Sequence, residues 1–252
     1  MTSWRLEELL IDVLAGMLDG LGHVAVGAAS PIPGAAALLA RERSGGALRV
    51  SVLGSERHNP FTDGNVELFD CAAQGRIDAF FLGGGQIDGA GNINLVGIGG
   101  YPQSRVRWSG SFGSAFMYFT VPRVILFRQE HTRRVLVPGV EFVSAPGTSP
   151  AHLYRPGGPH ALVTERCVFD FDRSRGRFRL RSVHPDQTVD EVLANTGFEF
   201  DLPDAVPKTP APAPETLSLI RGPVGAAIAE TYPRFAAETL GIEALARATA
   251  TI

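Results

Sequence analysis

The feature that most constrains the fold is an alternation of short apolar segments with stretches of helix-forming residues. Segments 23–29, 48–53 and 79–82 are apolar or β-branched, as buried strands are. Between them, 31–43 and 65–78 have the composition of helices. Such alternation is typical of a mostly parallel sheet covered by helices. We therefore predict an α/β fold with an open, mostly parallel sheet flanked by helices.

The second half of the chain continues with strands and one more helix. Segment 123–129, "RVILFRQ", has the pattern of another buried strand. The segments 161–172 and 177–183 flank a polar turn and predict a hairpin in which Gly176 adopts a positive φ. A helix is expected over "QTVDEVLANTG", with Thr188 as its N-cap.

The segment 201–214, "DLPDAVPKTPAPAP", contains too many prolines for a helix or a central strand. It predicts an extended strap on the surface. A helix is expected from about Glu215, and the Ala-rich tail from Pro223 is expected to be helical. Because a tail of about forty residues is small for an independent core, we predict one domain over residues 1–252.

Composition excludes several classes of protein. The 252 residues are 44% hydrophobic and 19% charged with a net charge of −3, which favours neither nucleic acid nor an anionic membrane as partner. No run approaches the ~20 apolar residues of a membrane span, and the first residues lack a signal-peptide pattern. We therefore expect a cytoplasmic protein. Cys71 and Cys167 lack metal-binding spacing and predict two buried free thiols without a metal site.

A run of glycines ends the predicted strand 79–82, in "FLGGGQIDGAGNIN". Gly83, Gly84 and Gly85 do not open a dinucleotide-binding loop, because Asp88 stands where that pattern needs its third glycine. Two explanations remain. The bare backbone N–H groups contact a substrate, or the glycines let two chain segments pack closely; the spacing favours close packing.

A second cluster, "WSGSFGSAFMYF" at 108–119, places Gly110, Gly113 and Ser114 before an apolar stretch with the pattern of a helix. Backbone N–H groups at such a start are suited to an anion or a developing oxyanion. A plain helix-start turn explains the same pattern, and both explanations stay open.

Taken in order, these segments resemble the β subunit of family I CoA-transferases, which include the glutaconate and 3-oxoacid CoA-transferases. The resemblance covers roughly residues 20–221. "GGGQIDGAGNIN" is similar to the family's Gly-x-x-Gln-Val-Asp-x-x-Gly-Asn-x-Asn segment, and "GSFGSAF" to its second glycine-rich loop. Segment 123–147 resembles its Glu-His strand, and 168–221 its C-terminal pattern.

The resemblance implies an open α/β sheet, coenzyme A as co-substrate without a permanently bound cofactor, and an α subunit as partner. It implies a catalytic glutamate at Glu56, in "VLGSERHNP", which attacks an acyl-CoA and becomes a glutamyl-CoA thioester. Where the family usually has Asn-Gly or Ser-Gly after this glutamate, Arg57 and His58 follow. A cation there either keeps the carboxylate ionised or ties it into an ion pair.

The remaining site residues follow from the same resemblance. Two segments are expected around the acyl group and coenzyme A: Gly83, Gly84, Gly85 and Gln86 in the first, and Gly110, Gly113 and Ser114 in the second. Gln86 and Asp88 either contact the substrate or have a structural role in the loop. His131, beside Glu130, is a possible acid–base residue, with a structural hydrogen bond as the alternative.

Two other functions remain open. The chain also resembles the β subunit of steroid-ring-cleaving CoA hydrolases, whose key glutamate belongs to the α chain. In that case this chain mainly shapes the pocket. The other function is that of a scaffold subunit without catalytic residues of its own.

Overall fold

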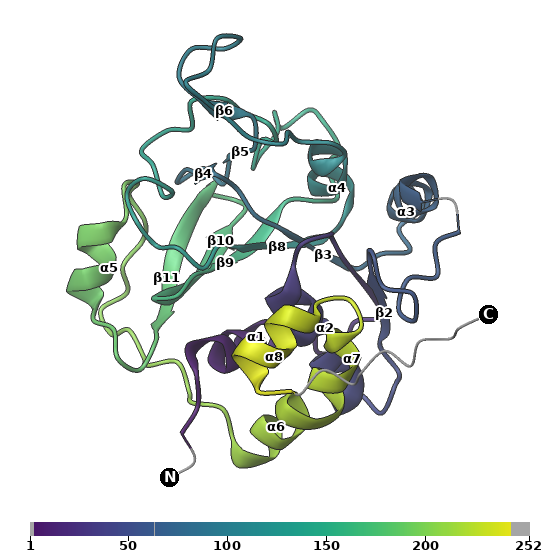
Figure 1. The fold of residues 1–252 in the computed structure, drawn as a ribbon. Coiled ribbons are helices and arrows are strands. Elements are labelled where there is room, and N and C mark those ends of the chain that lie inside the picture. Colours follow the sequence, from purple (N-terminus) through teal and green to yellow (C-terminus); the bar gives the residue numbers. More distant parts are fainter. Residues whose placement is uncertain (1–2, 63, 243–252) are drawn as a thin grey trace.

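The structure, a computed structural model, describes residues 3–62 and 64–242 (Figure 1). Its centre is a seven-stranded sheet in the order β11-β10-β9-β8-β3-β1-β2. The strands β2, β1, β3, β8 and β9 run parallel to one another, and β10 runs antiparallel to both of its neighbours, β9 and β11. This confirms the predicted α/β fold with a mostly parallel sheet. The bounds are β1 His23–Val26, β2 Arg49–Val52, β3 Ala79–Leu82, β8 Arg123–Phe127, β9 Pro159–Val163, β10 Cys167–Asp172 and β11 Arg177–Val183.

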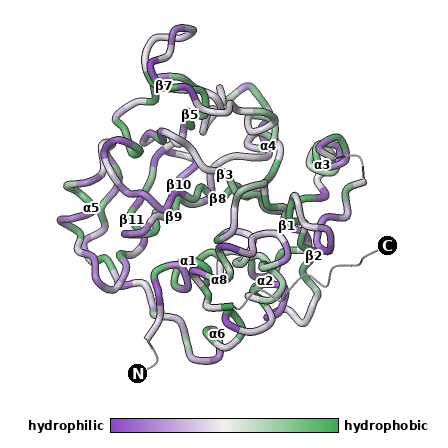
Figure 2. Tube along the Cα trace, in the orientation of Figure 1, coloured by the Kyte–Doolittle hydropathy of each residue, from purple (hydrophilic) through white to green (hydrophobic). Residues whose placement is uncertain are grey.

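Helices and small hairpins cover the two faces of the sheet, and each face has its own apolar core. Along β3, Phe81 belongs to one core and Phe80 to the other, as alternation in a doubly covered strand requires. Figure 2 shows apolar residues mainly in the central strands and in the helices packed on them. The first face carries α1 Leu6–Gly16, α2 Pro31–Arg43, η1 Ile220–Val224, α7 Gly225–Ala229 and α8 Pro233–Leu240, preceded by α6 Pro214–Leu219. The second core includes residues of α3 Gly64–Ala73, α4 Ser114–Thr120, α5 Val189–Asn195, β4 Gln86–Ile87 and β5 Ile93–Asn94; the hairpin β6 Gly97–Ile98 and β7 Val106–Arg107 follows β5.

The strand order creates a crevice at one edge of the sheet. The chain passes from β1 outward to β2 and then crosses back to β3 on the other side of β1. The connections after β1 and β3 therefore leave the sheet in different directions. In open α/β sheets such a switch point, at the carboxyl ends of the strands, is where ligands bind.

The helix predicted over 65–78 ends at Ala73, and Gly75 just beyond it has a positive φ of 69°. Two apolar stretches are each divided by a turn that a polar side chain closes. The expected strand 161–172 is split into β9 and β10 by a turn in which Thr164 Oγ1 accepts from the N–H groups of Arg166 at 3.2 Å and Cys167 at 3.3 Å. The stretch 92–99, "NINLVGIG", forms two short strands, β5 and β6, rather than one, because Asn94 Oδ1 accepts from the N–H groups of Val96 and Gly97.

The C-terminal third follows the predictions closely. Thr188 caps α5 in a capping box with Glu191, and Gly176 has a φ of 63°. The segment 201–214 lies extended beside β11, to which it is joined by backbone hydrogen bonds at two places. Helices α7 and α8 occupy the tail; residues 243–252 lie outside the described part. Among the described residues, no helix combines the length and apolar character needed to cross a bilayer.

Candidate functional site

A cleft of about 1210 Å³ opens at the switch point of the sheet. Segments that follow the carboxyl ends of four strands line it: Gly27–Ser30 after β1, Leu53 after β2, Gly83–Gln86 after β3 and Arg128 after β8. The loop 108–114 before α4 lines it as well. Both glycine clusters that the sequence singled out therefore meet at one cleft.

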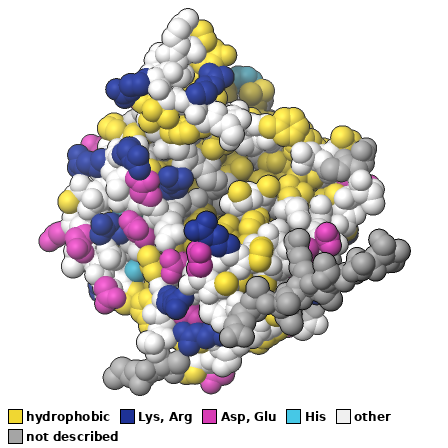
Figure 3. All heavy atoms as spheres, viewed as in Figure 1, with side chains coloured by type: hydrophobic (Ala, Val, Ile, Leu, Met, Phe, Trp, Pro, Cys, Tyr) yellow, Lys and Arg dark blue, Asp and Glu magenta, His cyan; other side chains and the backbone are white. Residues whose placement is uncertain are grey.

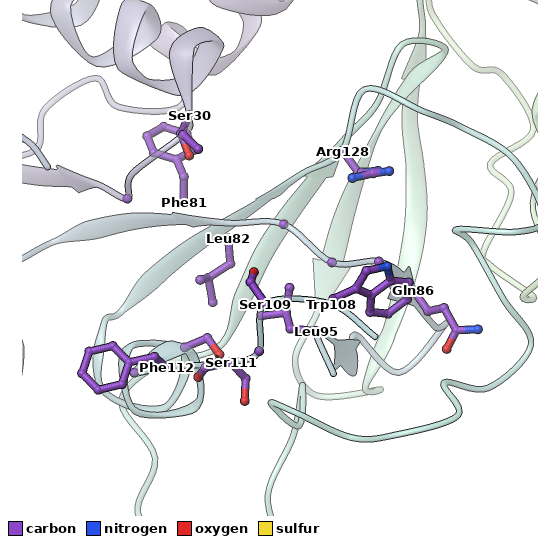
Figure 4. A pocket seen from close by; sticks show the side chains of 18 of the residues that line it. Ser30, Phe81, Leu82, Gln86, Leu95, Trp108, Ser109, Ser111, Phe112 and Arg128 are labelled. Carbon is purple, nitrogen blue, oxygen red and sulfur yellow. Dashed lines mark hydrogen bonds between the residues drawn. The ribbon is translucent and has the colours of Figure 1, made fainter. Parts of the chain in front are cut away.

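The side chains around the cleft are mainly apolar. Figure 4 shows Trp108 and Gln86 at one end and Phe112 at the other, with Leu82 and Leu95 between them. Figure 3 shows apolar side chains gathered over the middle of this face of the molecule. An apolar cleft with a few polar groups is the usual form of a small-molecule site.

Close packing explains the three glycines after β3. A Cβ on Gly85 would lie 2.3 Å from Cη2 of Trp108, because the indole packs directly on this backbone. A Cβ on Gly84 would lie 2.4 Å from Cγ2 of Ile93, and one on Gly83 would lie 3.1 Å from the carbonyl oxygen of Phe127. The packing explanation that the spacing favoured is therefore confirmed.

Some backbone N–H groups of the two glycine loops donate hydrogen bonds within the protein, and others do not. Gly85 N–H donates to the Asn94 carbonyl at 2.9 Å, and Ser114 N–H donates to the Ser111 carbonyl at 3.1 Å. The N–H groups of Gly83 and Gly84 have no acceptor among the described residues. Contact between these two amides and a substrate stays a prediction.

The second glycine loop is a tight turn that leads into α4. Gly110 and Gly113 have φ values of 103° and 71°, which favour glycine. A Cβ on Gly113 would also lie 2.3 Å from Cζ of Phe69 on α3. Ser114 Oγ donates to the Ser111 carbonyl at 2.8 Å, so both donors of Ser114 are used within the loop.

Gln86 and Asp88 hold loops together. Gln86 is 4% exposed; its Nε2 donates to Glu141 Oε1, and its Oε1 accepts from Asn94 Nδ2 at 2.8 Å. Asp88 accepts from the N–H groups of Ala90 and Asn92, both at 3.0 Å, and thereby closes the hairpin turn. Gln86 also lines the cleft, whereas Asp88 does not.

Glu56 lies on the loop after β2, at the same edge of the sheet as the cleft. Its side chain is exposed and has no hydrogen-bond or ion-pair partner among the described residues, so the ion pair with Arg57 is not formed. Its N–H donates to Glu230 Oε1 at 2.7 Å. Leu53 lines the cleft, but Glu56 does not. The catalytic role of Glu56 stays a prediction.

Four arginines add positive charge to the cleft: Arg105, Arg128, Arg133 and Arg134. Arg134 pairs with Glu130 at 2.7 Å, whereas Arg105 has no ion-pair partner within the described part of the chain. Arg128 follows a buried parallel strand directly, and that position at the carboxyl end of β8 could have indicated it.

His131 lies in the core rather than at the cleft. It is fully buried, its Nδ1 is 2.8 Å from Thr164 Oγ1, and its Nε2 is 2.9 Å from Thr196 Oγ1. Burial, with the charge of Arg166, lowers the pKa of His131 to about 4. Both ring nitrogens are therefore occupied in a neutral imidazole, which favours the structural hydrogen bond over acid–base work.

This environment makes the protein less stable in mild acid. The unfolded chain protonates His131 below its ordinary pKa of about 6.5, whereas the folded chain does so only near 4. His131 therefore lowers the free energy of unfolding as pH falls from 6.5 to 4, by about 3 kcal/mol in total. Urea unfolding at pH 7, 6 and 5 should show a shallower pH slope for His131→Gln than for the wild type. The exposed His152→Gln control should keep the wild-type slope, and equal slopes in all three proteins would contradict the prediction.

The two cysteines are free thiols, as predicted. Cys167 is fully buried, and burial raises the pKa of its thiol. The predicted burial of Cys71 is wrong: this thiol on α3 is only half-buried, because it lies at the margin of the second core. Among the described residues, no group of three or more His, Cys, Asp and Glu side chains is arranged to hold a metal ion.

Known proteins with similar sequences and folds carry out different reactions. The chain is 35% identical over 148 residues to the B subunit of glutaconate CoA-transferase from Acidaminococcus fermentans, covering 56% of this chain and 54% of that one. The crystal structure of that organism's enzyme matches with a TM-score of 0.78 and 25% identity, over 90% of this chain and 98% of that one. The cholesterol ring-cleaving hydrolase IpdB subunit of Rhodococcus jostii is 36% identical over 162 residues, 62% of each chain.

The crystal structure of a variant of the decarboxylase AibA/AibB also matches, with a TM-score of 0.75 and 26% identity over 90% of this chain and 99% of that one. The chain thus matches only 54% to 62% of the length of the two curated relatives. The sequence model of the family described as Coenzyme A transferase matches residues 22–195, which include the cleft-lining segments after β1, β2, β3 and β8. The chain therefore belongs to the Coenzyme A transferase family.

Proposed function

We propose that the chain is the β subunit of a heteromeric enzyme that moves coenzyme A between an acyl-CoA and a carboxylic acid. One observation carries the proposal: Glu56 presents a carboxylate without a partner among the described residues, at the carboxyl edge of the sheet where the glycine-lined cleft opens. An exposed carboxylate is a competent nucleophile toward a thioester.

The reaction divides into balanced steps. The Glu56 carboxylate attacks the thioester carbonyl and expels the CoA thiolate, which leaves an acyl–glutamyl anhydride. The thiolate then attacks the glutamyl carbonyl of the anhydride, so the first carboxylate departs and a glutamyl-CoA thioester remains. An acceptor carboxylate reverses both steps and regenerates Glu56.

The cleft contains groups that suit the oxyanion of the reaction and the phosphates of coenzyme A. The unused N–H groups of Gly83 and Gly84 are suited to the oxyanion of each tetrahedral intermediate. Two arginines that line the cleft are suited to the phosphates of coenzyme A: Arg105, which has no ion-pair partner among the described residues, and Arg128, which pairs with Glu130 at 3.1 Å. No proton is transferred in the cycle, so the buried His131 is not required.

An exposed aromatic patch at the open side of the cleft is the expected contact with the α subunit. Phe112 and Phe116 are 83% and 41% exposed and both contact the ring of Phe69, with centroid distances of 5.8 and 5.6 Å. Contiguous exposed apolar side chains of this kind mark interaction sites. Phe112 also lines the cleft, so a partner bound here would help to close it.

Replacing Phe112 with serine should therefore weaken the complex of the two subunits. A central aromatic of an interface contributes about 2 kcal/mol or more to binding, which corresponds to a Kd at least about 30-fold higher. Sedimentation analysis of the two separately purified subunits measures this Kd. Tyr154→Ser is a matched control, because Tyr154 is 87% exposed but lies outside the patch. Equal Kd values for both variants would place the interface elsewhere.

Chemical trapping tests the proposed reaction. The chain is co-expressed with its α-type partner and incubated with acetyl-CoA, glutaconyl-CoA or benzoyl-CoA, and then with borohydride. Borohydride reduces a glutamyl thioester to an alcohol, and peptide mass spectrometry should locate this change at Glu56. Thioester hydrolysis with an unmodified Glu56 would contradict the transferase mechanism.

The position of Glu56 outside the cleft lining favours one second candidate. In a ring-cleaving hydrolase of the kind named among the relatives, the α subunit would supply the glutamate and this chain would supply the cleft walls. A scaffold subunit without catalytic residues would give the same labelling result. A glutamate of the α subunit whose replacement stops hydrolysis would then distinguish the hydrolase.

A further inference from the structure

A turn near the C-terminus holds the loop that carries Glu56. Residues 230–232 join α7 to α8, and they lie beyond the part of the chain that the family sequence model matches. Ile228 packs into the core against α2, where a Cβ on Gly34 would lie 2.9 Å from its Cδ1. The turn is thereby fixed next to the carboxyl ends of β1 and β2.

Glu230 accepts three hydrogen bonds at this turn. Ser55 Oγ donates to its Oε2 at 2.7 Å, the N–H of Glu56 donates to its Oε1 at 2.7 Å, and Thr231 Oγ1 donates to its Oε2 at 2.8 Å. Burial opposes ionisation, but these three donors outweigh it and the pKa of Glu230 lies below its ordinary value. Glu230 is therefore an ionised acceptor. Hydrogen bonds to a charged carboxylate oxygen are stronger than hydrogen bonds between neutral groups.

Ser55 connects Glu230 to the rest of the loop after β2. It is 5% exposed, and its Oγ accepts from the N–H of His58 at 2.8 Å and from the N–H of Arg57 at 3.2 Å. The Ser55 hydroxyl, which donates to Glu230, thus also fixes the backbone of the next residues in the loop. Gly54, with a φ of 90°, gives the chain the turn that this arrangement needs.

The same turn also holds the loop after β1. The hydroxyl of Tyr232 accepts from the N–H of Ser30 at 3.1 Å. Ser30 and Ala29 line the cleft, and Ala29 has a positive φ of 55°, which a non-glycine residue rarely adopts. Two loops at the edge of the cleft are therefore fixed by one short segment.

From these contacts we infer that Glu230 is a positioning residue, which holds the backbone of Glu56 so that its carboxylate is presented to the acyl-CoA. The inference rests on the proposed function. Loss of the anchor leaves the cleft walls intact, so binding of acyl-CoA is retained while attack is slowed. A displacement of about 1 Å at a reacting group lowers a rate by as much as about 100-fold.

Steady-state transfer and hydrogen–deuterium exchange test the inference in the assembled two-subunit enzyme, with the acyl-CoA thioesters used for trapping. Glu230→Ala should lower kcat about 10- to 100-fold and leave KM for the acyl-CoA within about twofold. Glu230→Gln keeps one acceptor oxygen and should lose only about three- to fivefold in kcat. Exchange at the Glu56 N–H should accelerate most in Glu230→Ala.

Glu238→Gln is the matched control, because Glu238 is a 63% exposed carboxylate on α8 that forms its ion pair with Arg234. It should match the wild type in all readouts. If Glu230→Ala does not fold, Glu230→Gln decides. Equality of Glu230→Gln and Glu238→Gln in both kcat and exchange would overturn the inference. If the wild type shows no label at Glu56, the proposed function fails, and the exchange measurement still decides whether Glu230 holds this loop.

Discussion

Replacement of Glu56 by glutamine should abolish transfer, with a loss of about 10³-fold or more in kcat. The amide is nearly the same size as the carboxylate but lacks the charge needed for attack on the thioester. Glu56→Asp keeps the charge but withdraws it by one methylene, so a loss of about 100-fold is expected. Initial rates of CoA exchange between the acyl-CoA and a labelled acid measure both variants.

The side chain of Glu56 is exposed and has no partner in the described part of the chain, so these substitutions should leave folding unchanged. Glu42→Gln, an exposed carboxylate at the end of α2, serves as the control and should retain full activity. Full turnover by Glu56→Gln would show that the nucleophile lies elsewhere, and it would favour the hydrolase-type arrangement in which the α subunit supplies the glutamate.

Replacement of Gly85 by alanine should both destabilise the protein and disturb the cleft. Its new Cβ would lie 2.3 to 2.5 Å from three ring atoms of Trp108, a distance at which one of the two segments has to move. Overpacking of this kind costs about 1–3 kcal/mol in unfolding free energy. Since Trp108 also lines the cleft, KM for the acyl-CoA should rise as the indole is displaced.

A double-mutant cycle with Trp108→Ala isolates this contact. In a chain that already lacks the indole, Gly85→Ala should cost at least about 1 kcal/mol less than it does in the wild type. Gly139→Ala is the matched control, because a Cβ there meets nothing within 4 Å; it should change stability by less than about 0.5 kcal/mol. Urea unfolding measures these free energies. An additive cycle would show that the indole is not what excludes a side chain at Gly85.

The strands and helices were predictable where hydrophobic pattern and local capping agree. The segment 79–82 is a strand over the same residues that the sequence marks, because its run of apolar side chains suits burial on both faces. Thr188 and Gly176 were identified because each has a local reason for its position. The breaks at Thr164 and Asn94 were missed, since a side chain that closes a turn leaves the apolar pattern around it unchanged.

The candidate site was predictable only in part. The glycine runs marked the cleft, but the strand order that brings them together was not predicted, because a mostly parallel sheet is compatible with many orders. The contact of Trp108 with Gly85 was not predictable, because it joins a side chain to the backbone of a residue that is distant in the sequence. Glu230 was not predictable either, because 175 positions separate it from its partner Ser55 and no local pattern connects them.

The proline-rich strap has a consequence for how the molecule behaves at high concentration. Its bonds to β11 occupy the backbone of that strand at two places, where Leu180 donates to the Asp201 carbonyl and Val183 to the Pro207 carbonyl. Proline has no N–H, so the outer side of the strap offers few donors to an incoming strand. Edge-to-edge polymerisation of β-sheets needs such a row of free donors. The strap therefore protects this margin of the sheet against aggregation in a crowded solution.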